Sequence, residues 1–142
     1  MLLAASPIGP LAQHMAIHVL SMNVAAPLLV LALRRVRSSG HGHLDRSPLG
    51  ATGLVVATLL QIFLLWGWHL PGALSAAMAD HALHAAMQLS LLVAAFWFWL
   101  AVAAQVGAAR WLAMGALLVT GKLFCLLGVL LVFTPRVLYP AI

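Results

Sequence analysis

The chain has 142 residues, of which 65% are hydrophobic and only 6% are charged. Two acids and seven Lys/Arg residues cannot cover a water-exposed surface, so a soluble globular enzyme and a disordered chain are excluded. The single cysteine excludes a disulfide framework within the chain, and a net charge of +5 on so apolar a chain is typical of membrane topology signals rather than of nucleic-acid binding.

Four stretches are apolar over enough residues to cross a bilayer as helices, which takes about 20 residues. In chain order they run from about residue 11 to 33, 49 to 68, 81 to 104 and 112 to 133. Pro27 lies inside the first stretch and predicts a kink there, and Asp80 can cap the start of the third. The sequence therefore predicts an all-α integral membrane protein, in which residues 1–142 form a single domain, a bundle of four transmembrane helices.

The connections between these helices predict the orientation of the bundle. The first connection is rich in arginine (Arg34, Arg35, Arg37 and Arg46), the third contains Arg110, and the second, residues 69–80, has neither Lys nor Arg. Because cytoplasmic loops carry an excess of Lys and Arg, we expect the first and third connections in the cytoplasm and both termini outside. The tryptophans then fall where interfacial belts are expected: Trp66, Trp68, Trp97, Trp99 and Trp111.

Five of the seven histidines fall on the predicted outer side of the bundle, in three segments that are far apart in the sequence. His14 and His18 lie in the outer turns of the first helix, His69 at the end of the second, and His81 and His84 in the first turns of the third. His14 and His18 are four residues apart and therefore share one helix face. The spacing predicts a cluster of imidazoles at one depth.

Such a cluster indicates a metal site, because ionisable residues within a span are costly and are functional candidates by default. Imidazole suits copper, zinc, iron and nickel, and a nearby thioether favours Cu(I). We expect a Cu(I) site. Its centre is His14, His18 and His84, with His69, His81 and Met22 around it.

Other interpretations of the histidines stay open. A haem could be held between His18 and His84, or the histidines could pack against partner subunits of a respiratory complex. His41 and His43 in the first connection are interpreted as part of a solvated turn. The sequence contains no nucleophile–base pair and no paired carboxylates, so we expect no catalytic activity.

A second set of polar residues is predicted deeper in the bilayer: Asn23, Gln61, Gln88 and Lys122. Each lies about 10–18 Å from the outer end of its helix at the usual rise per residue. Lys122 is too far from either interface to reach it comfortably, and neither acid of the chain lies at that depth. We therefore expect Lys122 to point into the bundle toward the other three residues, or toward a partner's carboxylate, and not toward lipid.

Four segments, taken together, are specific enough to indicate a family. They are His14-Met-Ala-Ile-His18 followed by Pro27 and a Leu-rich run, Trp66-Gly-Trp-His69-Leu-Pro71, His81-Ala-Leu-His84 at the start of a helix that ends in Phe96-Trp-Phe-Trp99, and Thr134-Pro-Arg-Val-Leu-Tyr139-Pro. In this order and spacing they resemble the membrane-integral CtaG-like family of cytochrome c oxidase assembly factors. The resemblance covers most of the chain. Family members are usually longer, so this chain is a short version of the family.

The resemblance implies a non-enzymatic role in the maturation of a haem–copper oxidase, through the supply of copper. It implies a multi-pass protein of the bacterial inner membrane, with the lipid bilayer and either oxidase subunits or a copper chaperone as partners, and no nucleic acid. Whether the chain forms homo-oligomers stays open. The alternative is a structural or bis-His haem-binding membrane subunit of a respiratory complex.

Overall fold

The computed structural model of the chain describes residues 10–39 and 50–133. The predicted turn with His41 and His43, and both ends of the chain, lie outside the described residues. Within these two ranges the elements are all helical and no strand is present. Four helices are long and apolar enough to cross a membrane, over Gln13–Val36, Ala51–Trp68, His81–Ala104 and Gly107–Leu131, which confirms the predicted four-helix membrane fold.

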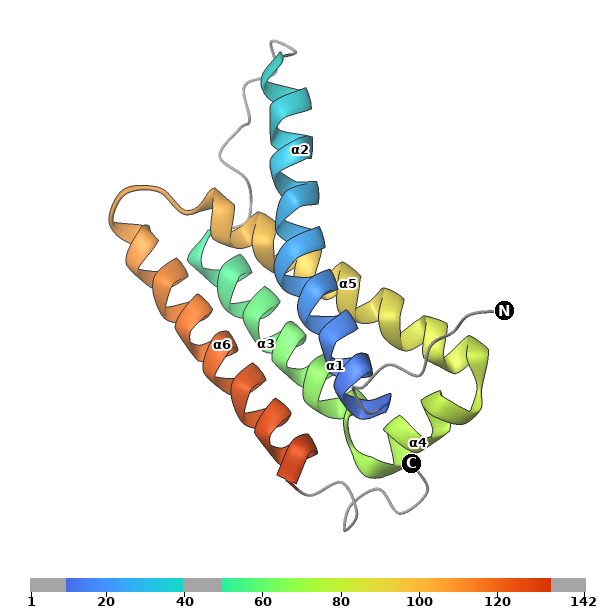
Figure 1. Cartoon of the computed structure of the whole chain (residues 1–142). Coiled ribbons are helices and arrows are strands. Elements are labelled where there is room, and N and C mark those ends of the chain that lie inside the picture. The colour runs from blue at the N-terminus through green and yellow to red at the C-terminus, as the bar shows by residue number, and fades with distance from the viewer. Residues whose placement is uncertain (1–9, 40–49, 134–142) are drawn as a thin grey trace.

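The first span is a continuous helix with three parts. These are α1 (Pro10–Leu20), a π turn η1 (Ser21–Ala25) and α2 (Ala26–Ser39), so the helix continues beyond its predicted end at residue 33. Figure 1 shows that α2 projects past the rest of the bundle at this end. The arginines Arg34 and Arg35 lie on these last turns, at the end of the bundle away from the start of α1.

The other three spans are α3 (Ala51–Trp68), α5 (His81–Ala104) and α6 (Arg110–Phe133), and a short 3-10 turn η2 (Gly107–Ala109) precedes α6. The Asp80 side chain accepts hydrogen bonds from the backbone N–H groups of Ala82 and Leu83, which confirms the predicted cap of α5. α5 is the central helix, because it packs against η1, α2, α3 and α4.

A short helix that the sequence analysis did not predict, α4 (Pro71–Ala79), connects α3 to α5. Pro71 stands in its first turn, where the missing N–H costs nothing. Leu74 and Ala77 are buried and join the apolar core. In Figure 1, α4 lies at the end of the bundle where α1 begins, beside the end of α3 and the start of α5.

The π turn lies at the kink that Pro27 predicts. In this turn the N–H of Ala26 donates to the carbonyl of Ser21, five residues earlier. The same pattern would pair the Met22 carbonyl with residue 27, but proline has no N–H to donate. The indole N–H of Trp99 on α5 donates to the Met22 carbonyl instead, at 2.8 Å. The irregular turn of the first helix is thus bonded to the central helix.

The buried row of the first span recurs at every fourth residue: His14, His18, Met22, Ala26 and Val30. In a regular α-helix such a row drifts around the axis, because one turn takes only 3.6 residues. A π turn bonds over five residues and takes more residues per turn, so it offsets part of this drift. The π turn therefore helps to keep both the histidines and the apolar residues below them facing the core.

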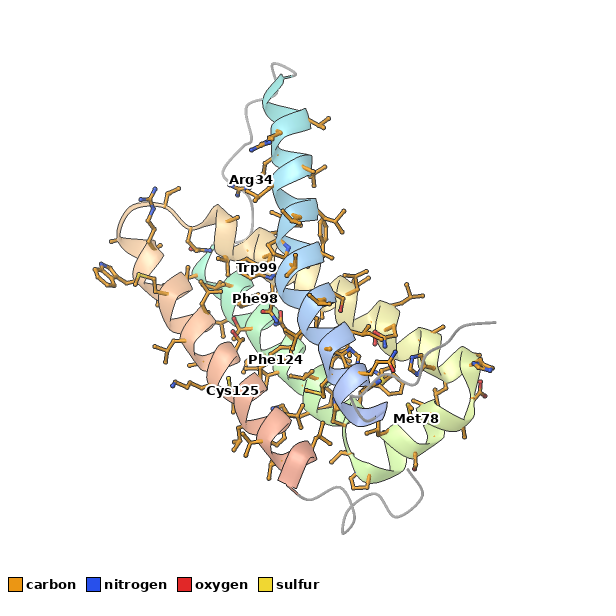
Figure 2. The ribbon with its side chains drawn as sticks, in the orientation of Figure 1. Arg34, Met78, Phe98, Trp99, Phe124 and Cys125 are labelled. Atoms are coloured by element: carbon orange, nitrogen blue, oxygen red, sulfur yellow. The ribbon has the colours of Figure 1, made fainter. Side chains whose placement is uncertain are left out.

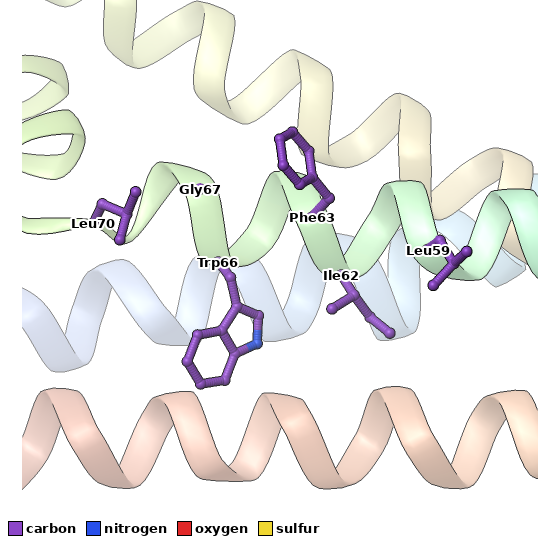
Figure 3. Close-up of a pocket in the computed structure, with 6 residues that line it drawn as sticks. All are labelled: Leu59, Ile62, Phe63, Trp66, Gly67 and Leu70. Atoms are coloured by element: carbon purple, nitrogen blue, oxygen red, sulfur yellow. The ribbon is translucent and has the colours of Figure 1, made fainter.

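Trp68 and Trp99 make specific contacts within the bundle, whereas Trp111 is exposed as expected of an interfacial belt. The Trp68 indole N–H donates to the Ser90 hydroxyl on α5 at 3.0 Å, which joins α3 to α5. Trp66 contributes to an apolar groove on the outside of α3, lined by Leu59, Ile62, Phe63, Trp66, Gly67 and Leu70. Figure 3 shows Trp66 and Ile62 on the side of α3 toward α6, with Phe63 on the other side. The groove is apolar, and no histidine lines it.

Candidate metal centre

Three buried histidines meet at the end of the bundle where α1 begins. His14 and His18 lie on α1, and His69 is the residue that follows the last turn of α3. Their side chains are 5%, 0% and 3% exposed. One ring nitrogen of each histidine lies within 4.8 Å of those of the other two. Since His69 comes from a different span than His14 and His18, this group exists only through tertiary packing.

The two histidines of α1 are in direct contact. Their Nε2 atoms are 2.9 Å apart, and the ring centroids are 4.3 Å apart with the planes nearly perpendicular. In such a contact one ring donates its N–H and the other accepts with a lone pair, so at least one of the two imidazoles is neutral. The spacing of four residues thus places a lone pair and a donor side by side in the core.

His69 completes the group from α3. Its Nδ1–H donates to the backbone carbonyl of Leu65 at 2.7 Å, so Nε2 carries the lone pair. The His69 ring centroid is 5.3 Å from that of His18 and 5.6 Å from that of His14. Burial lowers the pKa of His69 below its ordinary value of 6.5 and favours the neutral form that binds metals. A carbonyl behind an imidazole fixes its tautomer and ring orientation, as at many metal sites.

His84 lies beside this group rather than at its centre, which corrects the predicted arrangement. It is half-buried on α5, with its ring centroid 5.8 Å from that of His14. The Gln88 amide nitrogen lies 3.4 Å from His84 Nε2, within hydrogen-bonding distance. His69 takes the central place because the Leu65 carbonyl orients its ring within the buried end of the bundle.

His81 and Met22 were expected around the centre. The structure turns His81 away from it, whereas Met22 shares the buried face of the first span with His14 and His18. His81 is exposed at the start of α5, and no ring contact among the described residues involves it. It stands six residues before the buried Met87, which is about 120° away around a helix of 3.6 residues per turn. Met22 is fully buried one turn below His18, within the apolar core that includes Ala26 and Leu65.

The deeper polar residues do not form the expected layer. Gln61 is buried and its Oε1 has no hydrogen-bond partner, Gln88 is half-buried, and Asn23 is exposed. Lys122 is exposed on α6, so the expectation that it points into the bundle is wrong. The buried face of α6 includes Thr120, and Lys122 is two residues further on, which turns it to the other side of the helix.

The group of His14, His18 and His69 fits a metal ion by its donors and by its spacing. The Nδ1 atom of His18 is buried without a hydrogen-bond partner, which costs about 1–3 kcal/mol unless something fills that role. Imidazole nitrogens around a tetrahedral ion lie about 3.3 Å apart at metal–nitrogen distances of about 2.0 Å. Ring nitrogens already within 4.8 Å of one another need only small side-chain movements to reach that spacing.

Sequence reasoning missed two features that shape this centre. The π turn was foreseen only as a kink at Pro27, because a proline signals an interrupted hydrogen bond but not how the helix accommodates it. For α4, the available signal was Pro71 followed by an alanine- and leucine-containing segment, a pattern that also suits an irregular connection. Both features affect which imidazoles face the core.

Comparison with family models gives a match over residues 5–142, nearly the whole chain. The matching family is described as cytochrome c oxidase caa3 assembly factor (Caa3_CtaG). This match confirms the resemblance found from the sequence segments. No match is found among curated proteins or among solved structures.

Proposed function

The chain belongs to the family of cytochrome c oxidase caa3 assembly factors, and from that premise we propose that it carries copper on His14, His18 and His69 during assembly of the oxidase. The supporting observation is that these three buried imidazoles offer ring nitrogens within 4.8 Å of one another. Imidazole is a good copper ligand, and a site of only two or three ligands can release its ion. Copper is therefore cargo in this proposal, and the protein is not an enzyme.

His84 serves as the ligand through which the ion enters. It is half-buried, whereas the three central histidines are almost fully buried, and its ring is 5.8 Å from that of His14. The neighbouring Gln88 amide orients the His84 ring through the contact at Nε2. An ion can pass from His84 to the central group by exchanging one nitrogen ligand for another.

A haem is the second candidate, and the geometry favours an ion over it. A bis-His haem needs two imidazoles on opposite sides of a flat macrocycle. The Nε2 atoms of His14 and His18 are only 2.9 Å apart, and the His69 ring lies against both. These contacts leave no space for a macrocycle between the three rings, whereas a single ion fits between nitrogens at this spacing.

Together with the copper site, we propose how the protein is oriented in the membrane and in which membrane it lies. The histidine end of the bundle faces the periplasm or exterior and the arginine end faces the cytoplasm, in a multi-pass protein of the bacterial inner membrane. In that orientation copper exchanges with an oxidase subunit or a copper chaperone on the outer side. The chain works as a single transmembrane domain, and the lipid bilayer surrounds it.

The test is copper retention by the full chain, purified in detergent and loaded anaerobically with Cu(I) against a competing chelator. We expect the wild type to retain copper, and His14→Ala, His18→Ala and His69→Ala each to lose it. His81→Ala is the matched control, because His81 is an exposed histidine at the same end of the bundle. Its copper retention should equal that of the wild type.

Oxidase activity in cells gives the second measurement. Under copper limitation, His18→Ala and His69→Ala should fail to support an active oxidase, and added copper should restore activity. Unchanged copper retention in both variants would reject the copper site. A haem absorbance band in the purified protein, lost in His18→Ala, would favour the second candidate instead.

A further inference from the structure

Lys122 stands alone on the outer face of α6. It is exposed, and it has no ion pair or hydrogen bond within the residues the structure describes. α6 packs against α3 through a row that contains Ala113, Thr120 and Leu127, and Lys122 lies on the other side of the helix. Figure 1 shows α6 at the edge of the bundle, and no other described helix covers this outer face.

The depth of Lys122 makes this exposure costly. α6 runs from Arg110 to Phe133, which puts Lys122 about 18 Å from its start and about 16 Å from its end at 1.5 Å per residue. The apolar core of a bilayer is about 30 Å thick, so the backbone of Lys122 lies near the middle of this core. Ionisable residues at that depth almost always face protein or water rather than lipid.

No acid of this chain can neutralise Lys122. The chain has two acids. Asp80 caps the start of α5 outside the spans, and Asp45 follows the first span in the sequence, within residues that the structure does not describe. A second copy of the chain would bring another Lys122 to the same depth and no carboxylate. The charge must therefore be matched by a different protein.

The side chains around Lys122 would allow a helix of another protein to pack against this face of α6. The neighbouring side chains on this face are apolar and exposed, among them Leu118, Leu126 and Val129. Gly121 and Cys125 flank the lysine, and a Cβ at Gly121 would meet nothing within 4 Å. Small residues let a second backbone approach closely, which is the usual basis of helix contacts in membranes.

We propose that the outer face of α6, centred on Lys122, binds a membrane-spanning helix of another protein that carries an Asp or Glu at the middle of the bilayer. The partner's carboxylate pairs with the Lys122 ammonium, and apolar side chains on both sides of the pair exclude lipid. This face differs from the histidine centre, so the partner can stay bound while the histidine end is free to exchange copper.

The test is site-specific photo-crosslinking of the full chain in its native membranes. A photoreactive amino acid replaces Leu118, one turn from Lys122, and as a control it replaces Val93, an exposed residue of α5. We expect one discrete protein adduct from position 118, with the crosslinked segment in a membrane span that contains an acid. Lys122→Met should reduce this adduct by at least about tenfold, because the partner's carboxylate then loses its counter-charge in the membrane. Lys122→Arg should retain it.

Charge exchange completes the test. Lys122→Glu should abolish the adduct, and replacing the partner's acid with Lys should restore it in the same cells. Cu(I) retention by Lys122→Met shows that the variant still folds, and it separates this proposal from the copper proposal. Adducts only to lipid, adducts only to a second copy of the chain, or an adduct that Lys122→Met leaves unchanged would each overturn the proposal.

Discussion

The indole N–H of Trp99 donates to the backbone carbonyl of Met22 at 2.8 Å, across 77 residues of sequence. This bond supplies the donor that Pro27 withholds from the π turn, so a side chain of the third span completes the backbone of the first. Met22 lies one turn below His18. The bond therefore stabilises the helix just beneath the candidate metal centre. Figure 2 labels Trp99 where α5 passes the first span.

Trp99→Phe should destabilise the protein by about 1–3 kcal/mol, because it leaves the buried Met22 carbonyl without a donor. The measurement is the free energy of unfolding in detergent. Trp111→Phe is the matched control, since Trp111 is 74% exposed. An exposed substitution of this kind should change the free energy by less than about 0.5 kcal/mol. Equal effects of the two substitutions would contradict the role assigned to the Trp99 bond.

Pro27→Ala should reduce the cost of Trp99→Phe. An alanine at position 27 has an N–H that can reach the Met22 carbonyl, five residues earlier in the π turn, and so replace the indole as donor. The double-mutant cycle should give a coupling of about 1 kcal/mol between the two positions. Additive effects would show that the π turn does not redirect this carbonyl.

Asp80→Ala should destabilise α5 by about 0.5–2 kcal/mol, the usual cost of losing an N-cap acceptor. The Asp80 carboxylate accepts from Ala82 N at 2.7 Å and from Leu83 N at 3.3 Å. Asp80→Asn keeps an acceptor oxygen and should lose much less. Hydrogen exchange of the first turn of α5, which carries His84, measures the effect directly. Equal exchange in both variants would argue against capping as the cause.

The stability of the protein should fall as the pH is lowered through 6.5. Burial lowers the pKa of His69 in the folded protein, whereas the unfolded chain has the ordinary value near 6.5. The unfolded state therefore binds a proton more readily, so His69 contributes stability above that pH and loses it below. The largest slope that one such group contributes is about 1.4 kcal/mol per pH unit. His69→Gln should flatten the curve of unfolding free energy against pH, and an unchanged slope would contradict this account.

Reporter fusions should show both termini outside and the first connection in the cytoplasm. Arginines gather at the far end of α2 from the histidines, and positive residues are retained in the cytoplasm. A fusion after Ser39 should report a cytoplasmic site, and a fusion after Ile142 an external one. The reverse result would place the histidine centre on the cytoplasmic side and reject copper exchange on the outer side.

The membrane fold could be predicted from the sequence because the length and apolarity of each span are local properties. The direction of a side chain around its helix could not. α6 is apolar on nearly all sides, so it has no hydrophobic period from which to infer that Thr120 faces the core and Lys122 does not. The packing that fixes this rotation is tertiary, and it is absent from a single span.

For the candidate site too, the features local to one helix could be predicted, and those that depend on packing between helices could not. The spacing of His14 and His18 on one face is a property of the helix, and the prediction of a shared face is confirmed by their contact. The exchange of roles between His84 and His69 depends on the Leu65 carbonyl and on the path of the chain into α4. Neither has a signature in the residue types alone.

The distribution of the three central histidines over two spans has a consequence for biosynthesis. When α1 enters the bilayer it carries two imidazoles whose later neighbours, His69 and the start of α5, have not yet been translated. A polar pair of this kind is unfavourable in lipid by itself. The first span therefore gains its full stability only after later spans have followed. In the proposed copper site, all three central histidines are present only once the second span has been made. Under the copper proposal, metal loading is in this sense a checkpoint on the assembly of the first two spans, because only a chain in which they have packed together has a place for the ion.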